Sequence, residues 1–158
     1  MTFAKLVELG QDPGCIYRGD MQLTIESDST AVRDGLAAVL ASPIIQTMED
    51  GARGTAEIVL AEVLNNIVEH AYADRSGKII LGLQHHPDGV LVTVQDKGNP
   101  FPQEELPQGL LPKIDSFADL PEGGFGWFLI RTLVRNLTYL RKDGCNHLSF
   151  CLPYEDAP

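Results

Sequence analysis

The stretch Thr55–Ala73, TAEIVLAEVLNNIVEHAYA, has the longest helical pattern in this chain and decides how the rest is interpreted. It contains no Gly or Pro and is rich in Ala and Leu, which favour helices. At about 100° per residue, one arc of this helix is apolar and predicts the face that packs on a core. The arc holds Leu60, Leu64, Ile67 and Ala71. Glu62 and Asn66 lie on the far side one turn apart, so a carboxylate and a carboxamide share one face.

Strand patterns lie on both sides of this helix. Met21–Ile25 alternates apolar and polar residues, which is typical of a strand with one buried face. A shorter amphipathic helix over Ala31–Leu40 follows, and residues 49–54 interrupt the helical pattern before the long helix begins. After the long helix, two β-rich runs at 78–84 and 90–95 are joined by a Pro-Asp-Gly turn. This arrangement predicts an antiparallel hairpin.

The last third of the chain predicts a loop, one more helix and two strands. Residues 99–122 hold five prolines and five acidic residues against one lysine, and a structureless loop of this length inside a compact domain is usually functional. We therefore expect a lid or binding loop there. Gly123-Gly124-Phe125-Gly126 then opens a helix over Trp127–Val134, and strands follow near 137–141 and 147–152.

The composition is that of one globular domain. The 158 residues are 44% hydrophobic, enough to bury a core without disulfides or a structural metal. The net charge of -10 repels phosphate backbones and anionic lipids, so we expect no direct nucleic-acid or membrane binding. Three cysteines without CxxC spacing, and the lack of a targeting segment, predict a cytoplasmic protein. Residues 1–18 contain a run of chain breakers and predict a partly disordered leader before the domain at 19–158.

Three short motifs carry polar groups that suit nucleotide chemistry. The first is the pair Glu62 and Asn66. The second, Asp96-Lys97-Gly98, directly follows a predicted strand, where the carboxylate can accept from an exocyclic amine and the glycine lets a ligand approach the backbone. The third, Gly124-Phe125-Gly126, opens a helix whose N-terminus suits phosphate. Each motif alone is more often an ordinary solvated helix face, turn or helix cap. The indication of a nucleotide site therefore comes from the order and spacing of the three motifs together.

In that order, the motifs resemble those of the stand-alone anti-sigma-factor serine/threonine-protein kinases. These kinases belong to the histidine-kinase-like superfamily of gyrase, heat-shock chaperone, histidine kinase and mismatch-repair ATPases. The resemblance spans about Met21 to Pro153 and rests on Glu62–Tyr72, Val94–Phe101, Gly123–Ile130 and Arg141–Phe150. Asn65 is only three residues after Glu62. Asn66 keeps the four-residue spacing and is therefore the residue that matches the family's motif.

The resemblance implies an α+β fold, a two-layer α/β sandwich of the Bergerat ATP-binding type. Its sheet is mixed and mostly antiparallel and is covered on one face by helices, with ATP held between the helices and the lid. Glu62 is then the general base, oriented to take a proton from the attacking hydroxyl. Asn66 is implied as the Mg²⁺ ligand, and Asp96 as the acceptor for the adenine amino group.

Glycines complete the implied site. Gly98 leaves room for the base, while Gly124 and Gly126 turn backbone N–H groups toward phosphate. The chain departs from several relatives at Asn146, where they have Thr, which puts nucleotide contacts from that strand in question. The motif Gly124-Phe125-Gly126 holds no Lys or Arg, and we expect an exposed or packing role for the nearby Arg131.

The function implied is an ATP- and Mg²⁺-dependent protein-serine/threonine kinase that acts as an anti-sigma factor. It would hold a sigma factor inactive, phosphorylate an anti-sigma-factor antagonist protein and pair as a homodimer. Two alternatives stay open. One is a nucleotide-binding module that sequesters its partner without kinase activity, and the other is a detached histidine-kinase catalytic domain.

Overall fold

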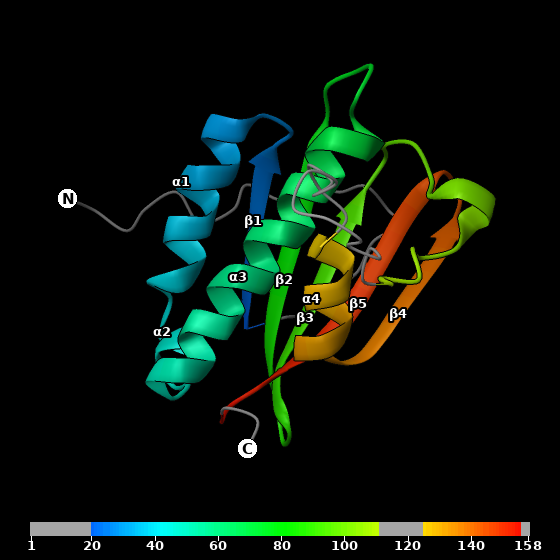
Figure 1. Cartoon of the computed structure of the whole chain (residues 1–158). Coiled ribbons are helices and arrows are strands. Elements are labelled where there is room, and N and C mark those ends of the chain that lie inside the picture. The colour runs from blue at the N-terminus through cyan, green and yellow to red at the C-terminus, as the bar shows by residue number, and fades with distance from the viewer. Residues whose placement is uncertain (1–19, 111–124, 156–158) are drawn as a thin grey trace, which may run out of the picture.

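The computed structural model describes residues 20–110 and 125–155, which form two layers (Figure 1). The strands are β1 (Met21–Glu26), β2 (Lys78–His86), β3 (Gly89–Asp96), β4 (Arg135–Lys142) and β5 (Cys145–Pro153). The helices are α1 (Ser29–Leu40), α2 (Pro43–Gln46), α3 (Asp50–Asn66) and α4 (Phe125–Leu133), with a π-helical turn η1 (Ile67–Ala71) and a 3-10 turn η2 (Pro102–Glu104). Helices α1, α3 and α4 lie on one face of the sheet (Figure 1), which confirms the predicted α+β class.

The five strands form one sheet in the order β1-β2-β3-β5-β4, and each described pairing is antiparallel. Directly opposite residues of an antiparallel pair project from the same face. The register therefore assigns side chains to the two faces at the end of β3. The helix-covered face bears Ile79, Asp96 and Asn146, and the opposite face bears Ile80, Gln95 and His147.

The core lies between the sheet and the helices, as the helical pattern predicts. All four residues of the predicted apolar arc are buried: Leu60, Leu64, Ile67 and Ala71 are 0%, 0%, 6% and 7% exposed. They pack in one cluster with apolar residues of the central strands, including Val92, Val94 and Phe150. This packing fixes the rotation of α3 and so directs its far side toward the site described below.

The start of the long helix differs from the prediction. It begins at Asp50 rather than near Thr55, so the expectation that residues 49–54 interrupt the helix was wrong. Ala52 and Ala56 are 2% and 0% exposed, and their packing holds the first turns in place. This burial offsets the cost of the two glycines in those turns, which is about 1 kcal/mol each in a helix interior.

The long helix ends in a local change of pitch. It is α-helical to Asn66 and π-helical over η1, where the N–H of Tyr72 donates to the carbonyl of Ile67 at 3.2 Å. Single π-helical turns inside α-helices are frequent at functional sites. The last helix also differs slightly from expectation, because α4 begins at Phe125 and so includes Gly126 in its first turn.

The remaining strands confirm the predicted pattern with longer ends, including the hairpin of β2 and β3. The short helix α2 was not predicted. The leader at 1–18, residues 111–122 of the lid and Gly124 lie outside the described residues. Within the described ranges, no helix is long and apolar enough to cross a membrane.

Candidate functional site

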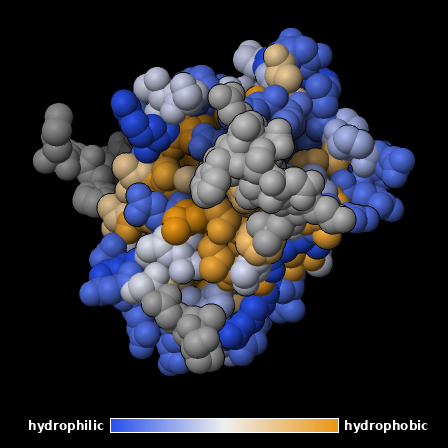
Figure 2. All heavy atoms as spheres, in the orientation of Figure 1, coloured by the Kyte–Doolittle hydropathy of each residue, from blue (hydrophilic) through white to orange (hydrophobic). Residues whose placement is uncertain are grey.

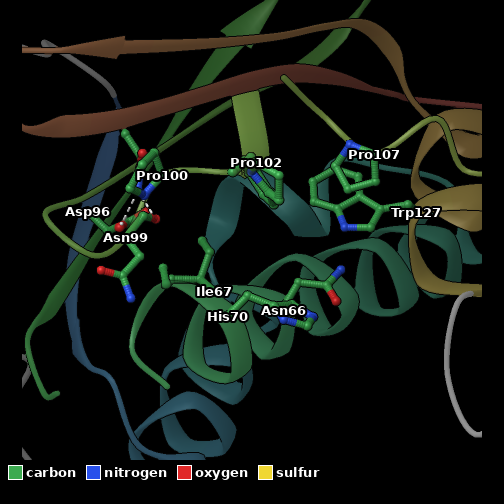
Figure 3. Close-up of a pocket in the computed structure, with 12 residues that line it drawn as sticks. Asn66, Ile67, His70, Asp96, Asn99, Pro100, Pro102, Pro107 and Trp127 are labelled. Atoms are coloured by element: carbon green, nitrogen blue, oxygen red, sulfur yellow. Dashed lines mark hydrogen bonds between the residues drawn. The ribbon is translucent and has the colours of Figure 1, made fainter. Parts of the chain in front are cut away.

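A cavity of about 400 Å³ lies between the helical layer and the end of β3 (Figure 3). The residues that line it are Asn66, Ile67, His70, Ala71, Asp96, Asn99, Pro100, Phe101, Pro102, Pro107, Trp127 and Asn146. In Figure 3, Asp96 lies toward one end and Trp127 toward the other, with Asn66 rising from the helical layer between them. Two of the predicted site residues, Asn66 and Asp96, therefore line one cavity, which is of a size that suits a small-molecule ligand.

Asp96 is the buried carboxylate of this cavity. The residue is 6% exposed, and its Oδ1 accepts from the N–H of Gly98 and from Nδ2 of Asn146, each at 2.8 Å. No hydrogen bond among the described residues uses Oδ2, which leaves that oxygen as an acceptor for a ligand. Burial raises the pKa of Asp96 above its ordinary value, although the hydrogen bonds from Asn146 and Gly98 and the charge of Arg141 oppose the rise.

A hydrogen-bond network on β4 and β5 holds this carboxylate. Asn146 Oδ1 accepts from the hydroxyl of Tyr139 at 2.7 Å and from Nη1 of Arg141 at 2.9 Å. The same Arg141 nitrogen donates to the carbonyl of Gly98 at 2.8 Å. The amide of Asn146 therefore has a fixed orientation, with Nδ2 directed at Asp96. The sequence left the role of this strand in question, and the structure places Asn146 in the cavity wall.

Glu62 and Gly126 lie beside Asn66, outside the cavity lining. A Cβ built on Gly126 would lie 2.5 Å from Glu62 Oε2 and 3.4 Å from Asn66 Nδ2, so the backbone of the first turn of α4 lies directly against this pair. Nδ2 of Asn66 is buried and has no hydrogen-bond partner among the described residues. The far side of α3 and the start of α4 thus form one polar corner next to the cavity.

Gly98 has a packing reason to be glycine. A Cβ at this position would lie 2.5 Å from the carbonyl oxygen of Ala71, and the N–H of Asn99 donates to that oxygen at 2.8 Å. Tyr72 adds a second link, because its hydroxyl donates to the carbonyl of Lys78 and accepts from the N–H of Lys97, both at 3.0 Å. The segment after β3 is therefore fastened to η1.

Sequence reasoning missed several residues of the cavity wall. His70, to which the sequence assigns no role in the site, is exposed and lines the cavity. His70 follows Asn66 by four residues, as Asn66 follows Glu62. This spacing could have predicted that His70 lies on the same face of the helix. Phe101 is another, and it packs edge-on against Trp127 and Tyr139, with ring centroids 5.2 and 5.0 Å apart.

Arg131 takes the exposed role that the sequence predicts. Its Nε donates to the carbonyl of Pro107 at 2.8 Å, which ties the loop after β3 to α4. The residue is exposed and is not part of the cavity lining.

The polar corner fits a magnesium ion held together with phosphates. Mg²⁺ is usually bound by one or two protein oxygens, with phosphate oxygens and waters completing the octahedron. The carboxamide of Asn66 supplies one such oxygen, and its buried Nδ2, a donor without a partner among the described residues, suits an acceptor such as a phosphate oxygen. The first turn of the nine-residue helix α4 lies next to it, where backbone N–H groups favour anions.

Comparisons with known proteins agree with this geometry. The family model for the histidine kinase-like ATPase domain matches residues 22–152. The chain is similar to the "Serine-protein kinase RsbW" of Halalkalibacterium halodurans, 38% identical over 90 residues that make up 56% of this chain and 55% of that protein. It is also similar to the proteins of that name from Oceanobacillus iheyensis (35% over 91 residues) and Staphylococcus aureus (30% over 93 residues), with 56% of this chain and 58% of each relative covered. The chain thus matches little more than half the length of these curated relatives.

Proposed function

The chain belongs to the histidine kinase-like ATPase domain family, and from this premise we propose that it is an ATP-dependent protein-serine/threonine kinase that acts as an anti-sigma factor. The observation that carries the proposal is the placement of Asn66 and Asp96 in one cavity, with Glu62 beside Asn66. The similarity to proteins named serine-protein kinase supports phosphoryl transfer to a protein hydroxyl.

In the proposed complex, the adenine end of ATP lies at Asp96 and the phosphates lie toward α4. Oδ2 of Asp96 accepts from the adenine amino group, since Oδ1 is already used by Gly98 and Asn146. The phosphates meet the backbone N–H groups near Gly126 and, by the same proposal, Gly124. Bound Mg²⁺, held by the Asn66 carboxamide, supplies charge neutralisation for the phosphates.

Glu62 is the proposed general base. Its carboxylate lies against the backbone of Gly126, at the end of the cavity where the phosphates are proposed to lie. From there it would orient a serine or threonine hydroxyl of the protein substrate and take its proton as the phosphoryl group transfers. General-base catalysis of this kind contributes about 10²- to 10⁴-fold to rate.

A surface feature beside Glu62 supports a protein as the acceptor of the phosphoryl group. Apolar residues gather on the surface over α3 and beside α4 (Figure 2). Ile58, one helical turn before Glu62, is 47% exposed. Apolar patches near a site commonly mark protein contacts. The partners in this proposal are a sigma factor, held inactive, and an anti-sigma-factor antagonist, which is phosphorylated.

The remaining parts of the proposal concern organisation and location. Residues 19–158 form the ATP-binding domain, residues 99–122 its lid and residues 1–18 a leader, and two copies pair as a homodimer. We place the protein in the cytoplasm, in keeping with the free thiols of Cys145 and Cys151.

Transfer of labelled γ-phosphate to the antagonist protein tests this function. Wild type should give an acid-stable phosphoprotein, whereas acid-labile label would indicate a histidine-kinase-type reaction. Glu62→Gln should retain ATP binding and lose transfer, and Glu69→Gln, at an exposed position of η1, is the matched control that should keep both. Full transfer by Glu62→Gln would contradict the assigned base. ATP binding by wild type without any transfer would identify a nucleotide-binding sequestration module instead.

A further inference from the structure

A second cavity, of about 420 Å³, lies at the same end of the sheet as the first. Tyr72, Arg75, Lys78, Ile80, Gln95 and Cys145 are among the residues that line it. It is about as large as the cavity proposed for ATP and shares Asp96 with it, and the proposed function uses none of its other lining residues.

The second cavity extends to the face of the sheet opposite the first, and Asp96 at the end of β3 lines both. Asp96 and Asn146, which line the first cavity, are paired across β3 and β5 and share the helix-covered face. Gln95 and Ile80 are paired across β3 and β2, one residue out of phase with Asp96, and therefore project from the other face. Gln95 and Ile80 therefore belong to the second cavity alone, and a ligand held against them lies on the other face of the sheet from Asn146.

A buried and unpartnered amide is the polar feature of the second cavity. Gln95 is 4% exposed, and its Oε1 has no hydrogen-bond partner among the described residues. A buried acceptor without a donor costs about 1 to 3 kcal/mol. Such a group in the wall of a ligand-sized cavity indicates a ligand that brings an N–H or O–H donor.

The charges around this cavity favour an anion. Three cationic residues line it, Arg75, Lys78 and Lys97, against the one carboxylate of Asp96, in a chain whose net charge is -10. The ion pairs of the first two are loose, since Nε of Arg75 lies 3.7 Å from Asp74 and Nζ of Lys78 lies 4.0 Å from Glu26. Both side chains are at least half exposed, at 50% and 68%. Nη2 of Arg75 also donates to Oδ1 of Asn99, so the ammonium of Lys78 is the group that turns more easily toward a ligand.

We propose that this cavity is a second binding site, which takes a small aromatic organic anion with an N–H or O–H donor. The ring system packs against Ile80 and the ring of Tyr72, the donor reaches Oε1 of Gln95, and the acidic group meets Arg75 and Lys78. The site adjoins that of ATP at Asp96 and does not depend on kinase activity.

The test uses 8-anilinonaphthalene-1-sulfonate, which combines aromatic rings, an N–H donor and an acidic group. Its fluorescence reports binding to the full chain, and amide chemical shifts locate the probe. We expect one bound probe per chain, with shifts clustered at 75–80 and 95–97. Excess ATP with Mg²⁺ should leave the probe bound. Lys78→Glu should weaken binding about tenfold, which corresponds to one lost charged contact. Arg33→Glu on α1, with the same change in net charge, should leave it unchanged.

Ile80→Trp fills the cavity and should abolish probe binding, while Leu91→Trp, on the same face of β3 but outside the lining, should retain it. Thermal unfolding of both variants checks that they fold. If Ile80→Trp does not fold, Lys78→Glu at its exposed position carries the test. Wild-type affinity in Lys78→Glu, release of the probe by ATP, or no binding by wild type would each overturn the proposal. None of these outcomes depends on phosphoryl transfer.

Discussion

Asn146 on β5 donates from Nδ2 to Oδ1 of Asp96 on β3 at 2.8 Å, and the two residues face each other directly in the sheet. This pair joins the carboxylate of the cavity to the network of Tyr139 and Arg141. The geometry of the proposed adenine acceptor is therefore set by a residue far along the chain.

Asn146→Ala should weaken ATP binding about 10- to 100-fold. The substitution removes one donor from a charged acceptor, and a hydrogen bond to a charged group contributes about 1.5 to 3 kcal/mol. Calorimetric titration with ATP and Mg²⁺ measures the change. Thr138→Ala is the control, because it removes a hydrogen bond between β4 and β5 on the opposite face of the sheet. Equal affinity in Asn146→Ala and wild type would show that Asp96 does not need this partner.

Asp96→Asn should stabilise the ligand-free protein at neutral pH while abolishing ATP binding. Burial raises the pKa of Asp96 in the folded state, so its contribution to stability is full below the unfolded pKa and is lost as pH rises through the folded pKa. The ionised form thus lowers the free energy of unfolding at pH 7, and asparagine does not ionise. ATP binding is lost because an amide N–H would face the adenine amino group.

Thermal unfolding between pH 4 and pH 7 measures this effect. The Tm advantage of Asp96→Asn should shrink as the pH falls and Asp96 becomes protonated. Asp34→Asn, at an exposed carboxylate on α1, should show no such trend. A Tm advantage that grows on acidification would reverse the assigned direction of the pKa change.

Gly126→Ala should lower phosphoryl transfer without lowering stability. The new Cβ would lie 2.5 Å from Glu62 Oε2, which is too close, so the carboxylate must move. It can move at little cost in stability because it is the far end of a flexible side chain. Alanine also favours the helix by about 1 kcal/mol. Gly54→Ala is the matched control: it places a Cβ in open space on α3 and should raise stability with transfer unchanged. Full transfer by Gly126→Ala would show that the position of Glu62 does not matter.

Tyr72→Phe should destabilise the protein by about 1 to 3 kcal/mol and weaken ATP binding. It removes the hydroxyl that joins Lys97 N–H to the carbonyl of Lys78, and so loosens the segment after β3 from η1. Denaturant unfolding gives the free-energy change. Tyr154→Phe removes a hydroxyl that contacts His85 at 3.0 Å on an exposed part of the surface, and should change neither property. If both variants behave alike, the link through Tyr72 contributes nothing specific.

Much of this architecture is predictable from the sequence because it follows from periodicity. The arc of Leu60 and Leu64 fixes which side of α3 faces the sheet, and it therefore also places Asn66 near the cavity. The Pro-Asp-Gly turn fixes the hairpin register, which places Asp96 at the end of β3 on the helix-covered face.

What escaped prediction depends on tertiary contacts. The early start of α3 rests on the burial of Ala52 against the core, which local propensity does not report. The role of Asn146 arises from pairing across fifty residues of chain, and the packing need for Gly98 arises from its approach to Ala71. Neither contact leaves a local pattern in the sequence.

The central claim is that the cavity between Asn66 and Asp96 binds ATP with Mg²⁺, and calorimetric titration of ATP tests it most directly. Wild type should bind, Asp96→Asn should lose the nucleotide, and Asn66→Ala should bind without dependence on Mg²⁺. Trp127, the single tryptophan of the sequence, lines the cavity, so its fluorescence should change in the same titration. Absence of binding by wild type up to millimolar ATP, or unchanged affinity in Asp96→Asn, would contradict the account.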